Sequence, residues 1–322
     1  MKKLIAVVLI AMPALLLRAQ SGSPPAELSA ALRPALDRIG RAHGRNLTAV
    51  FGNFTYGDSG MAGPFSRFLQ EQLAQALAES PYFDLVVLNA LDNLDPAFLK
   101  AFGGVFKPEQ ADSLIRGTYS EESGRVAVNL EVISLTDGTL IGKTKVAFDK
   151  ALLPAQAALK PQNYGRAAAA GRLLGGLLPA GPAGFSVRVA TNRGNGGVYR
   201  DGEELTISFF ADRDAYLKLY HIDVNGRVKL IFPNPFHSDN RIRAGRLTVI
   251  PDESYPFRFV LGPPYGTEYI KAIASTEPFS EVEGAFQELG PAGRELLTRG
   301  LEARREGGLV AEALLSYTIV ER

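Results

Sequence analysis

The sequence contains no cysteine among its 322 residues. The chain therefore forms no disulfide bond, even in an oxidising compartment where disulfides persist. It also lacks the thiol on which a lipoprotein anchor is built. Histidine is scarce as well: His43, His221 and His237 are the only three, and no two have the spacing of ligands on one helix face. We therefore predict no metal site and no cofactor.

Net charge is also small. Lysine and arginine number 35 and aspartate and glutamate 34, which gives a formal charge of +1. Nucleic-acid-binding domains carry a basic patch or stripe, so this balance predicts no nucleic-acid partner. Hydrophobic residues make up 46% and charged residues 21% of the chain, proportions typical of a folded protein. The length suffices for two domains.

The first residues, 1–19, have the features of a cleavable secretion signal. Two lysines precede an apolar run over residues 4–17, and Ala19 offers a small residue for cleavage. The run is shorter than the about 20 residues that a membrane span needs. We expect export across the inner membrane to the periplasm or envelope, and a mature chain with no integral membrane span. An uncleaved N-terminal anchor is the alternative.

Residues 45–149 are predicted to form an α/β domain. Apolar residues at helical spacing predict helices over 26–42, before this domain, and over 64–80, with Pro64 suited to the first helical position. A short helix is also predicted over 95–102. Strands are predicted from apolar or alternating runs over residues 47–54, 82–88, 114–119, 125–135 and 140–148. The Asp137-Gly138 pair between the last two runs indicates a hairpin.

Residues 150–184 are rich in alanine, glycine and proline, and predict a helical linker that ends in a hinge over 179–184. Residues 185–322 then predict a mainly β, sandwich-like domain, because short alternating runs are separated by Gly, Pro and Asp turns. The expected strands cover residues 205–209, 216–222, 228–232, 247–250, 257–261, 269–274 and 314–320. A helical excursion is expected over 286–305.

The N-terminal segments resemble the α/β domain shared by the curli secretion factor CsgG, the flagellar envelope protein FlgO and the N-terminal domain of TolB. The runs that carry this resemblance are Ala49–Phe54, Pro64–Ser80, Tyr82–Val87, Ala111–Tyr119 and Val126–Leu140. The resemblance implies an envelope protein that docks to a partner or self-associates. Without a lipid-bearing cysteine, propeller repeats or paired long membrane-facing hairpins, we expect neither acylation, nor TolB itself, nor a secretion pore.

The C-terminal segments, over Val187–Phe279, resemble the bacterial family DUF4384. The resemblance is carried by Gly197–Tyr199, Asp201–Glu203, Leu205–Phe209, Leu230–Asn234 and Lys271–Ser275, among shorter matches. Members of this family are exported or attached to other modules, and they share no agreed activity. The resemblance therefore implies a fold class more than a function.

No motif for catalysis or for ion binding stands out. Gly194–Gly197 is glycine-rich, but neither the Lys-Ser or Lys-Thr pair nor the helix that a phosphate cradle needs follows it. Asp212, Asp214, Asp223 and Asn225 lack the spacing of a calcium-binding loop, and we interpret them as turn formers. We predict no catalytic residue, and hence no enzyme.

The most distinctive local feature is an aromatic, proline-fixed loop next to two guanidinium groups. Such a loop can hold a ligand or a peptide. The alternative is a rigid turn between strands with solvated arginines. The residues that we select as a candidate ligand or partner loop are Phe232, Asn234, Phe236, His237, Arg241 and Arg243.

These observations favour an exported, non-catalytic envelope protein that binds a partner or serves as an assembly scaffold. The α/β domain would dock to an envelope protein or self-associate, and the β domain would present loops for recognition. One alternative is a periplasmic binding module for cell-wall glycan or a small ligand, which would use the loop over 232–243. A second is a hydrolase of unfamiliar type, although the sequence offers no convergent acid–base set.

Overall fold

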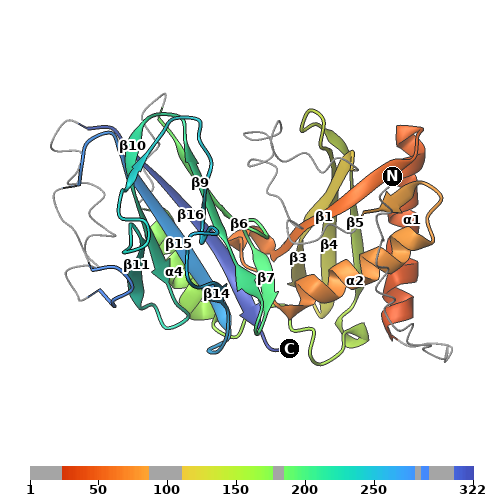
Figure 1. Ribbon diagram of the computed structural model, residues 1–322. Helices are drawn as coiled ribbons and strands as arrows, with labels where there is room; N and C mark the ends of the chain where they lie inside the picture. The colour runs from red at the N-terminus through yellow and green to blue at the C-terminus, as the bar shows by residue number, and fades with distance from the viewer. Residues whose placement is uncertain (1–23, 87–110, 177–184, 280–283, 290–307) are drawn as a thin grey trace, which may run out of the picture.

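The computed structural model of the chain describes residues 24–86, 111–176, 185–279, 284–289 and 308–322. An N-terminal α/β region is followed by a β-rich region, with the two side by side in Figure 1, which confirms the predicted fold class. The predicted signal over 1–19, the short helix over 95–102 and the hinge over 179–184 lie outside the described residues.

In the residues that the structure describes, the α/β region has two helices on one face of a five-stranded sheet. The helices are α1 (Pro24–His43) and α2 (Pro64–Ala78), and a short 3-10 turn, η1 (Gly57–Ser59), precedes α2. The strands are β1 (Leu47–Tyr56), β2 (Phe83–Leu85), β3 (Ser113–Glu122), β4 (Arg125–Ser134) and β5 (Leu140–Asp149). Their order is β2-β1-β3-β4-β5, with β1 parallel to β2 and β3 and the remaining pairs antiparallel.

Hydrophobic periodicity explains which faces are buried. The predicted helical stripe of α1, which includes Leu28, Leu32 and Leu36, is fully buried against the sheet. α2 begins at Pro64, whose fixed φ and missing N–H suit the first helical position. In β4 the alternating valines and leucine point into the same core, so Asn129 and Glu131 project from the opposite face.

The segment after β5 differs from the prediction of a continuous helical linker. Residues 150–163 form the 3-10 turn η2 (Lys150–Leu152) and irregular structure, and helix α4 covers only Tyr164–Gly176. The irregular part packs into the α/β core through Ala157 and Leu159. The Tyr119 hydroxyl donates to the Leu159 carbonyl at 3.0 Å and accepts the Gly63 N–H at 2.8 Å, which ties this segment to the start of α2.

The β-rich region is a sandwich of sheets. Its strands are β6 (Val187–Thr191), β7 (Gly197–Arg200), β8 (Glu204–Leu205), β9 (Ile207–Ala211), β10 (Ala215–Ile222), β11 (Val228–Phe232), β12 (Arg241–Ile242), β13 (Thr248–Ile250), β14 (Phe259–Val260), β15 (Gly266–Ser275) and β16 (Val310–Val320). The larger sheet has the order β11-β10-β15-β16-β7, with β12 also paired to β10. A sheet β13-β9-β6 faces it, and a ribbon of β14 and β8 lies at one end.

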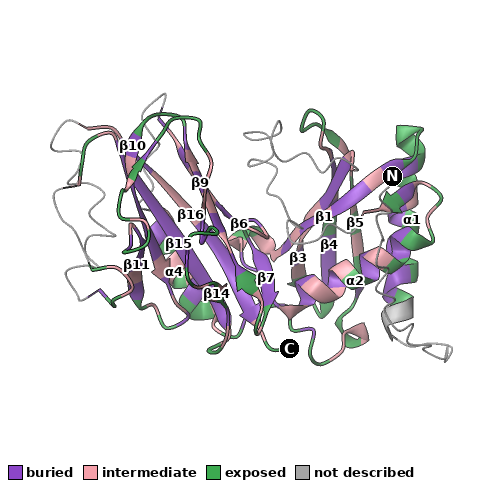
Figure 2. Cartoon of the chain, viewed as in Figure 1, coloured by how far each residue is buried: buried purple, intermediate pink, exposed green. Residues whose placement is uncertain are grey.

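β15 is central to this region and is buried along its whole length (Figure 2). On one face, residues such as Ile270 and Ala272 join the core between the sheets. On the other face, α4 covers the strand: the Tyr269 hydroxyl donates to the Ala167 carbonyl, and the Lys271 ammonium group donates to the Leu174 carbonyl. Helix α4 therefore packs with the β-rich region.

The predicted strands over 216–222 and 228–232 form a hairpin. β10 and β11 are antiparallel and joined by the turn over 223–226, in which the Asp223 carboxylate accepts the backbone N–H groups of Asn225 and Arg227.

The helix expected to begin at Phe286 does not begin there. Residues 284–289 instead run beside β11, whose free edge accepts the N–H groups of Phe286 and Leu289. Residues 290–305 of that prediction lie outside the described residues.

Candidate functional site

Two residues of the predicted loop, Phe232 and Asn234, are buried and stabilise the turn itself. Phe232 is buried in the sandwich core, with its ring centroid 5.0 Å from that of Phe209. Asn234 is also buried, and its amide nitrogen donates to the Ile231 carbonyl at 2.8 Å and to the Tyr255 hydroxyl at 3.1 Å. Its amide oxygen accepts the backbone N–H groups of residues 236 and 237. Phe232 and Asn234 therefore hold the loop and do not present a contact surface.

Phe236 is the exposed aromatic residue of this loop, with 48% of its surface accessible. Its ring packs edge-on against Phe257, with 5.3 Å between the ring centroids, and in a tilted arrangement against Tyr255, with 5.9 Å between the centroids. Phe257 in turn contacts Phe259 and Phe286. We call Phe236, Tyr255, Phe257, Phe259 and Phe286 the aromatic cluster. The proline-fixed loop pointed to Phe236 alone among these residues, although the spacing Tyr255, Phe257, Phe259 is a signal for side chains on one face.

The two arginines of the predicted loop stand apart from the aromatic cluster. Arg241 lies on β12 and forms an exposed ion pair with Asp214 at 3.8 Å. Arg243 is exposed beyond the same strand. Among the described residues, neither guanidinium lies over an aromatic ring. The structure thus brings together Phe232, Asn234, Phe236 and His237, and leaves the arginines as a separate basic edge.

A second candidate site is a cavity of about 380 Å³ at the end of the sandwich where the β8–β14 ribbon lies. Three polar side chains meet on its lining. Glu268 Oε2 lies 2.8 Å from His221 Nε2 and 2.6 Å from the Tyr317 hydroxyl, and the His221 and Tyr317 rings are stacked. We call these residues the His–Glu–Tyr group. The remaining lining is mostly aliphatic.

The register of the larger sheet explains how the His–Glu–Tyr group forms. Glu268 of β15 lies directly opposite Tyr317 of β16, and His221 of β10 lies opposite Ile270, two residues along from Glu268 on the same face. This face is the one that points between the sheets. Burial, and next the charge of Glu268, raise the pKa of Tyr317 well above its ordinary value, so its hydroxyl stays protonated and donates to the carboxylate.

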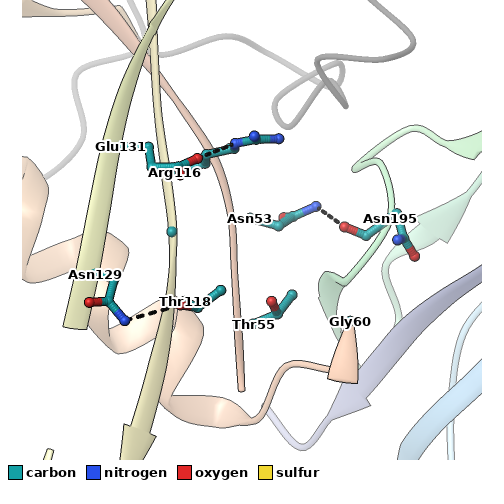
Figure 3. Close-up of a pocket in the computed structure, with 10 residues that line it drawn as sticks. Asn53, Thr55, Gly60, Arg116, Thr118, Asn129, Glu131 and Asn195 are labelled. Carbon is teal, nitrogen blue, oxygen red and sulfur yellow. Dashed lines mark hydrogen bonds and ion pairs between the residues drawn. The ribbon is translucent and has the colours of Figure 1, made fainter. Parts of the chain in front are cut away.

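A polar cleft of about 280 Å³ lies between the two regions (Figure 3). Its floor is the face of the N-terminal sheet opposite to α1 and α2, where Arg116 and Glu131 form an ion pair at 3.1 Å. The Asn53 amide donates across the cleft to the carbonyls of Arg193 and Asn195, at 2.6 and 2.8 Å. These side chains already have protein partners, so the cleft joins the regions and offers few free groups to a ligand.

Other expectations concern ions and membranes. Asp223 accepts the backbone N–H groups of its own turn, as predicted for a turn former. Asp212 instead accepts hydrogen bonds from Ser186, and Asp214 accepts one from the backbone of Ala244, so these two carboxylates join separate segments of the chain. In the part of the chain that the structure describes, no three His, Asp or Glu side chains gather as they would around a metal ion. Within the same described ranges, no helix has the length and apolar character to cross a membrane.

Comparison with protein families gives one assignment. Residues 198–278 match the domain of unknown function DUF4384. The match confirms the resemblance expected for this part of the chain and contains the aromatic residues Phe236 to Phe259 together with His221 and Glu268. Tyr317 lies outside it. No curated protein matches the chain.

Comparison with solved structures gives only distant likenesses. The C-terminal domain of LpoB from Salmonella enterica matches with a TM-score of 0.30 and 14% identity, over 38% of this chain and 99% of that domain. The Escherichia coli LpoB domain gives 0.29 and 16%, with the same coverage. TolB from Acinetobacter baumannii gives 0.21 and 11%, over 74% of this chain and 56% of that protein. Likenesses at these scores carry no functional argument, and the resemblance of the α/β region to CsgG and FlgO stays a prediction.

Proposed function

We propose that the protein is an exported, non-catalytic component of the cell envelope that binds a protein partner through the aromatic cluster. The observation that carries the proposal is Phe236, a half-exposed aromatic side chain on a turn that the buried Asn234 amide holds in place. The envelope placement is supported by the leader-like residues 1–19.

The geometry of the turn favours a protein partner over a glycan or another polar ligand. The amide nitrogen and oxygen of Asn234 already form hydrogen bonds within the turn and to Tyr255. The loop therefore offers an apolar surface with few free hydrogen-bonding groups. Aromatic anchors of this kind dominate the binding energy of protein interfaces. A turn that is already ordered also lowers the entropy cost of association.

We also propose domain boundaries that modify the predicted ones slightly. Residues 150–159 pack with the α/β region through Ala157 and Leu159, whereas α4 packs on β15. The division between the two folding units would then lie near Pro161, within the predicted linker over 150–184. Residues 45–149 and 185–322 keep the α/β and β-rich assignments proposed for them.

Site-specific photocrosslinking tests the proposed partner surface. A photoreactive phenylalanine analogue is placed at position 236 in cells, and in a matched variant at Leu173, which is 60% exposed on α4. We expect one discrete protein adduct from position 236 and none of that mass from position 173. The same partner should co-purify with the Leu173→Ser variant and be lost from Phe236→Ser.

Two results would contradict the proposal. Identical adducts from positions 236 and 173 would show that the aromatic cluster is not the contact surface. An intact precursor retained in the cytosol, seen by mass spectrometry of fractionated cells, would remove the envelope placement. A concentration-dependent dimer that Phe236→Ser abolishes would instead identify a second copy of the chain as the partner.

A further inference from the structure

We propose that the cavity lined by the His–Glu–Tyr group is a binding site for a small organic amine. Its ammonium group would bind Glu268, and its apolar body would lie against the aliphatic walls. This inference does not rest on the partner-binding proposal: Phe259 belongs to both places, but the polar group of the cavity is formed by His221, Glu268 and Tyr317, and Phe236 does not line it.

The position of the polar side chains is the first argument. Residues that point between the two sheets of a sandwich are normally apolar, because their side chains make up its core. Here Ile270, Ala272 and Leu315 obey this rule, whereas Glu268 and His221 continue the same faces with polar groups. A buried carboxylate costs free energy unless it is hydrogen-bonded or paired. Packing alone therefore gives no reason for Glu268 at this place.

The hydrogen bonds of Glu268 leave one of its oxygens without a partner. Both donors of the group, His221 Nε2 and the Tyr317 hydroxyl, bind Oε2. Among the described residues none donates to Oε1, although Glu268 is only 6% exposed and lines the cavity. An ionised carboxylate accepts hydrogen bonds through both oxygens and donates none. A ligand group that meets Oε1 must therefore be a donor.

The charges around the cavity favour a cationic donor. Tyr317 stays a neutral phenol, and Asp223, whose charge also reaches Tyr317, is paired with Arg227 at 2.7 Å, so Glu268 is the acidic group on the lining. The cationic Arg258 also lines the cavity, but it is exposed and its Nη1 donates to the carbonyls of Asp252, Tyr255 and Phe257. The inner end is thus acidic and the rim basic, an arrangement that disfavours a carboxylate at the inner end.

The walls and the size define the rest of the ligand. The volume of about 380 Å³ lies in the range of small-molecule sites. The aliphatic lining is formed by Leu205, Ile207, Ile231, Ile270 and Ile319, with Leu261 and Pro263 from the ribbon side. Such walls suit a saturated hydrocarbon body and offer nothing to a sugar's hydroxyl groups.

Three probes of one shape but different charge test the inference. Cyclohexylmethylamine, cyclohexylmethanol and cyclohexanecarboxylate are titrated into the full mature protein at neutral pH, with binding followed by NMR chemical shifts. We expect saturable amine binding with shifts centred on His221 and Tyr317. Its dissociation constant should be at least tenfold below that of the alcohol, and the carboxylate should bind most weakly.

Two variants test whether the amine binds to the Glu268 carboxylate or is attracted by any nearby acidic side chain. Glu268→Gln keeps the shape of the side chain and removes its charge, so the amine should bind no better than the alcohol. Glu204→Gln removes an exposed carboxylate on β8, next to the wall residue Leu205, and should keep the full preference.

Equal binding of the three probes to the wild-type protein, or shifts scattered over the surface and abolished by salt, would overturn the inference even if Glu268→Gln failed to fold. An amine preference that survives in folded Glu268→Gln would overturn it as well.

Discussion

Arg67 of α2 and Glu203 of the turn between β7 and β8 are 136 positions apart in the chain, and their side chains form an ion pair at 3.2 Å. The same carboxylate accepts Arg193 Nη1 at 2.6 Å and the Arg200 backbone N–H at 2.7 Å. Glu203 thus separates two guanidinium groups, one from each region. Both guanidinium groups also donate to the Val198 carbonyl, so the two cations lie close together. Burial, and next the charge of Arg193, lower the pKa of Arg67.

Glu203→Gln should weaken the contact between the two regions. The substitution leaves Arg67 and Arg193 facing each other in a partly buried site with no anion between them. We expect a loss of about 2–3 kcal/mol in the free energy of unfolding, less than the about 3–5 kcal/mol for a fully buried pair, because the Glu203 side chain is 29% exposed. Urea denaturation measures it. Glu71→Gln is the control, since its pair with Arg200 at 3.4 Å is exposed and should be worth under about 1 kcal/mol. Equal losses in both variants would refute the role of Glu203.

The same carboxylate predicts a pH dependence of stability. Burial of Glu203 acts to raise its pKa, but hydrogen bonds from Arg193 and the Arg200 backbone, with both arginine charges, outweigh it and lower the pKa overall. A carboxyl whose folded pKa is depressed stabilises the fold above its unfolded pKa of about 4.3 and loses that contribution as pH falls through the folded value. The stability difference between wild type and Glu203→Gln should therefore be constant near pH 6 and shrink below pH of about 4. A difference that does not change with pH down to 3 would contradict this assignment.

Local periodicity correctly predicted those helices and strands whose buried face can be recognised from their own residues. The leucine stripe of α1, Pro64 at the start of α2 and the alternating residues of β4 follow from helical and strand geometry alone. The segment over 150–163 has helix-forming residues, yet tertiary contacts to Tyr119 hold it in an irregular path. Phe286 was misjudged for a related reason: the open edge of β11 accepts its backbone N–H.

The candidate sites show the same limit. The turn around Asn234 was predictable because its residues are neighbours in sequence. The His–Glu–Tyr group was not, because His221 and Tyr317 reach Glu268 from 47 and 49 positions away. Only the pairing register of β10, β15 and β16 brings them together. That register cannot be predicted from the local pattern of a single sequence. His221 alone gave no signal beyond a packed or surface side chain.

Lys271 and Glu312 form an ion pair at 2.7 Å whose side chains are 0% and 2% exposed. Lys271→Met leaves the Glu312 carboxylate buried without its partner, so we expect a loss of about 3–5 kcal/mol. The double variant Lys271→Met, Glu312→Leu removes both charges and should recover most of that loss. A double-mutant cycle by chemical denaturation measures the coupling. Additive losses would show that the two groups are not energetically paired.

Asn234→Ala should loosen the turn that carries Phe236. It removes both acceptor and donor groups, and leaves the N–H of Phe236 without an acceptor, whereas the N–H of His237 keeps its bond to the Asn234 carbonyl. Each unsatisfied polar group costs about 1–3 kcal/mol. We expect a measurable loss of stability together with faster amide hydrogen exchange over 234–237. Asp239→Ala, which affects an exposed turn, is the control. Unchanged exchange in Asn234→Ala would mean that the turn is held by other contacts.

Gly196 tests how tightly the two regions fit. Its φ is +77°, and a Cβ there would lie 2.6 Å from Thr55 Cγ2 and 2.9 Å from the Gly60 carbonyl oxygen, both in the α/β region. Gly226 has a nearly identical φ of +79° but nothing within 4 Å of its Cβ position. Gly226→Ala should therefore show the backbone strain alone, about 1–2 kcal/mol. Gly196→Ala should lose more, and should speed hydrogen exchange at the amides of 193–196 because the added methyl group pushes that loop away from Asn53. Equal losses in the two variants would show that the regions can separate at this point without cost.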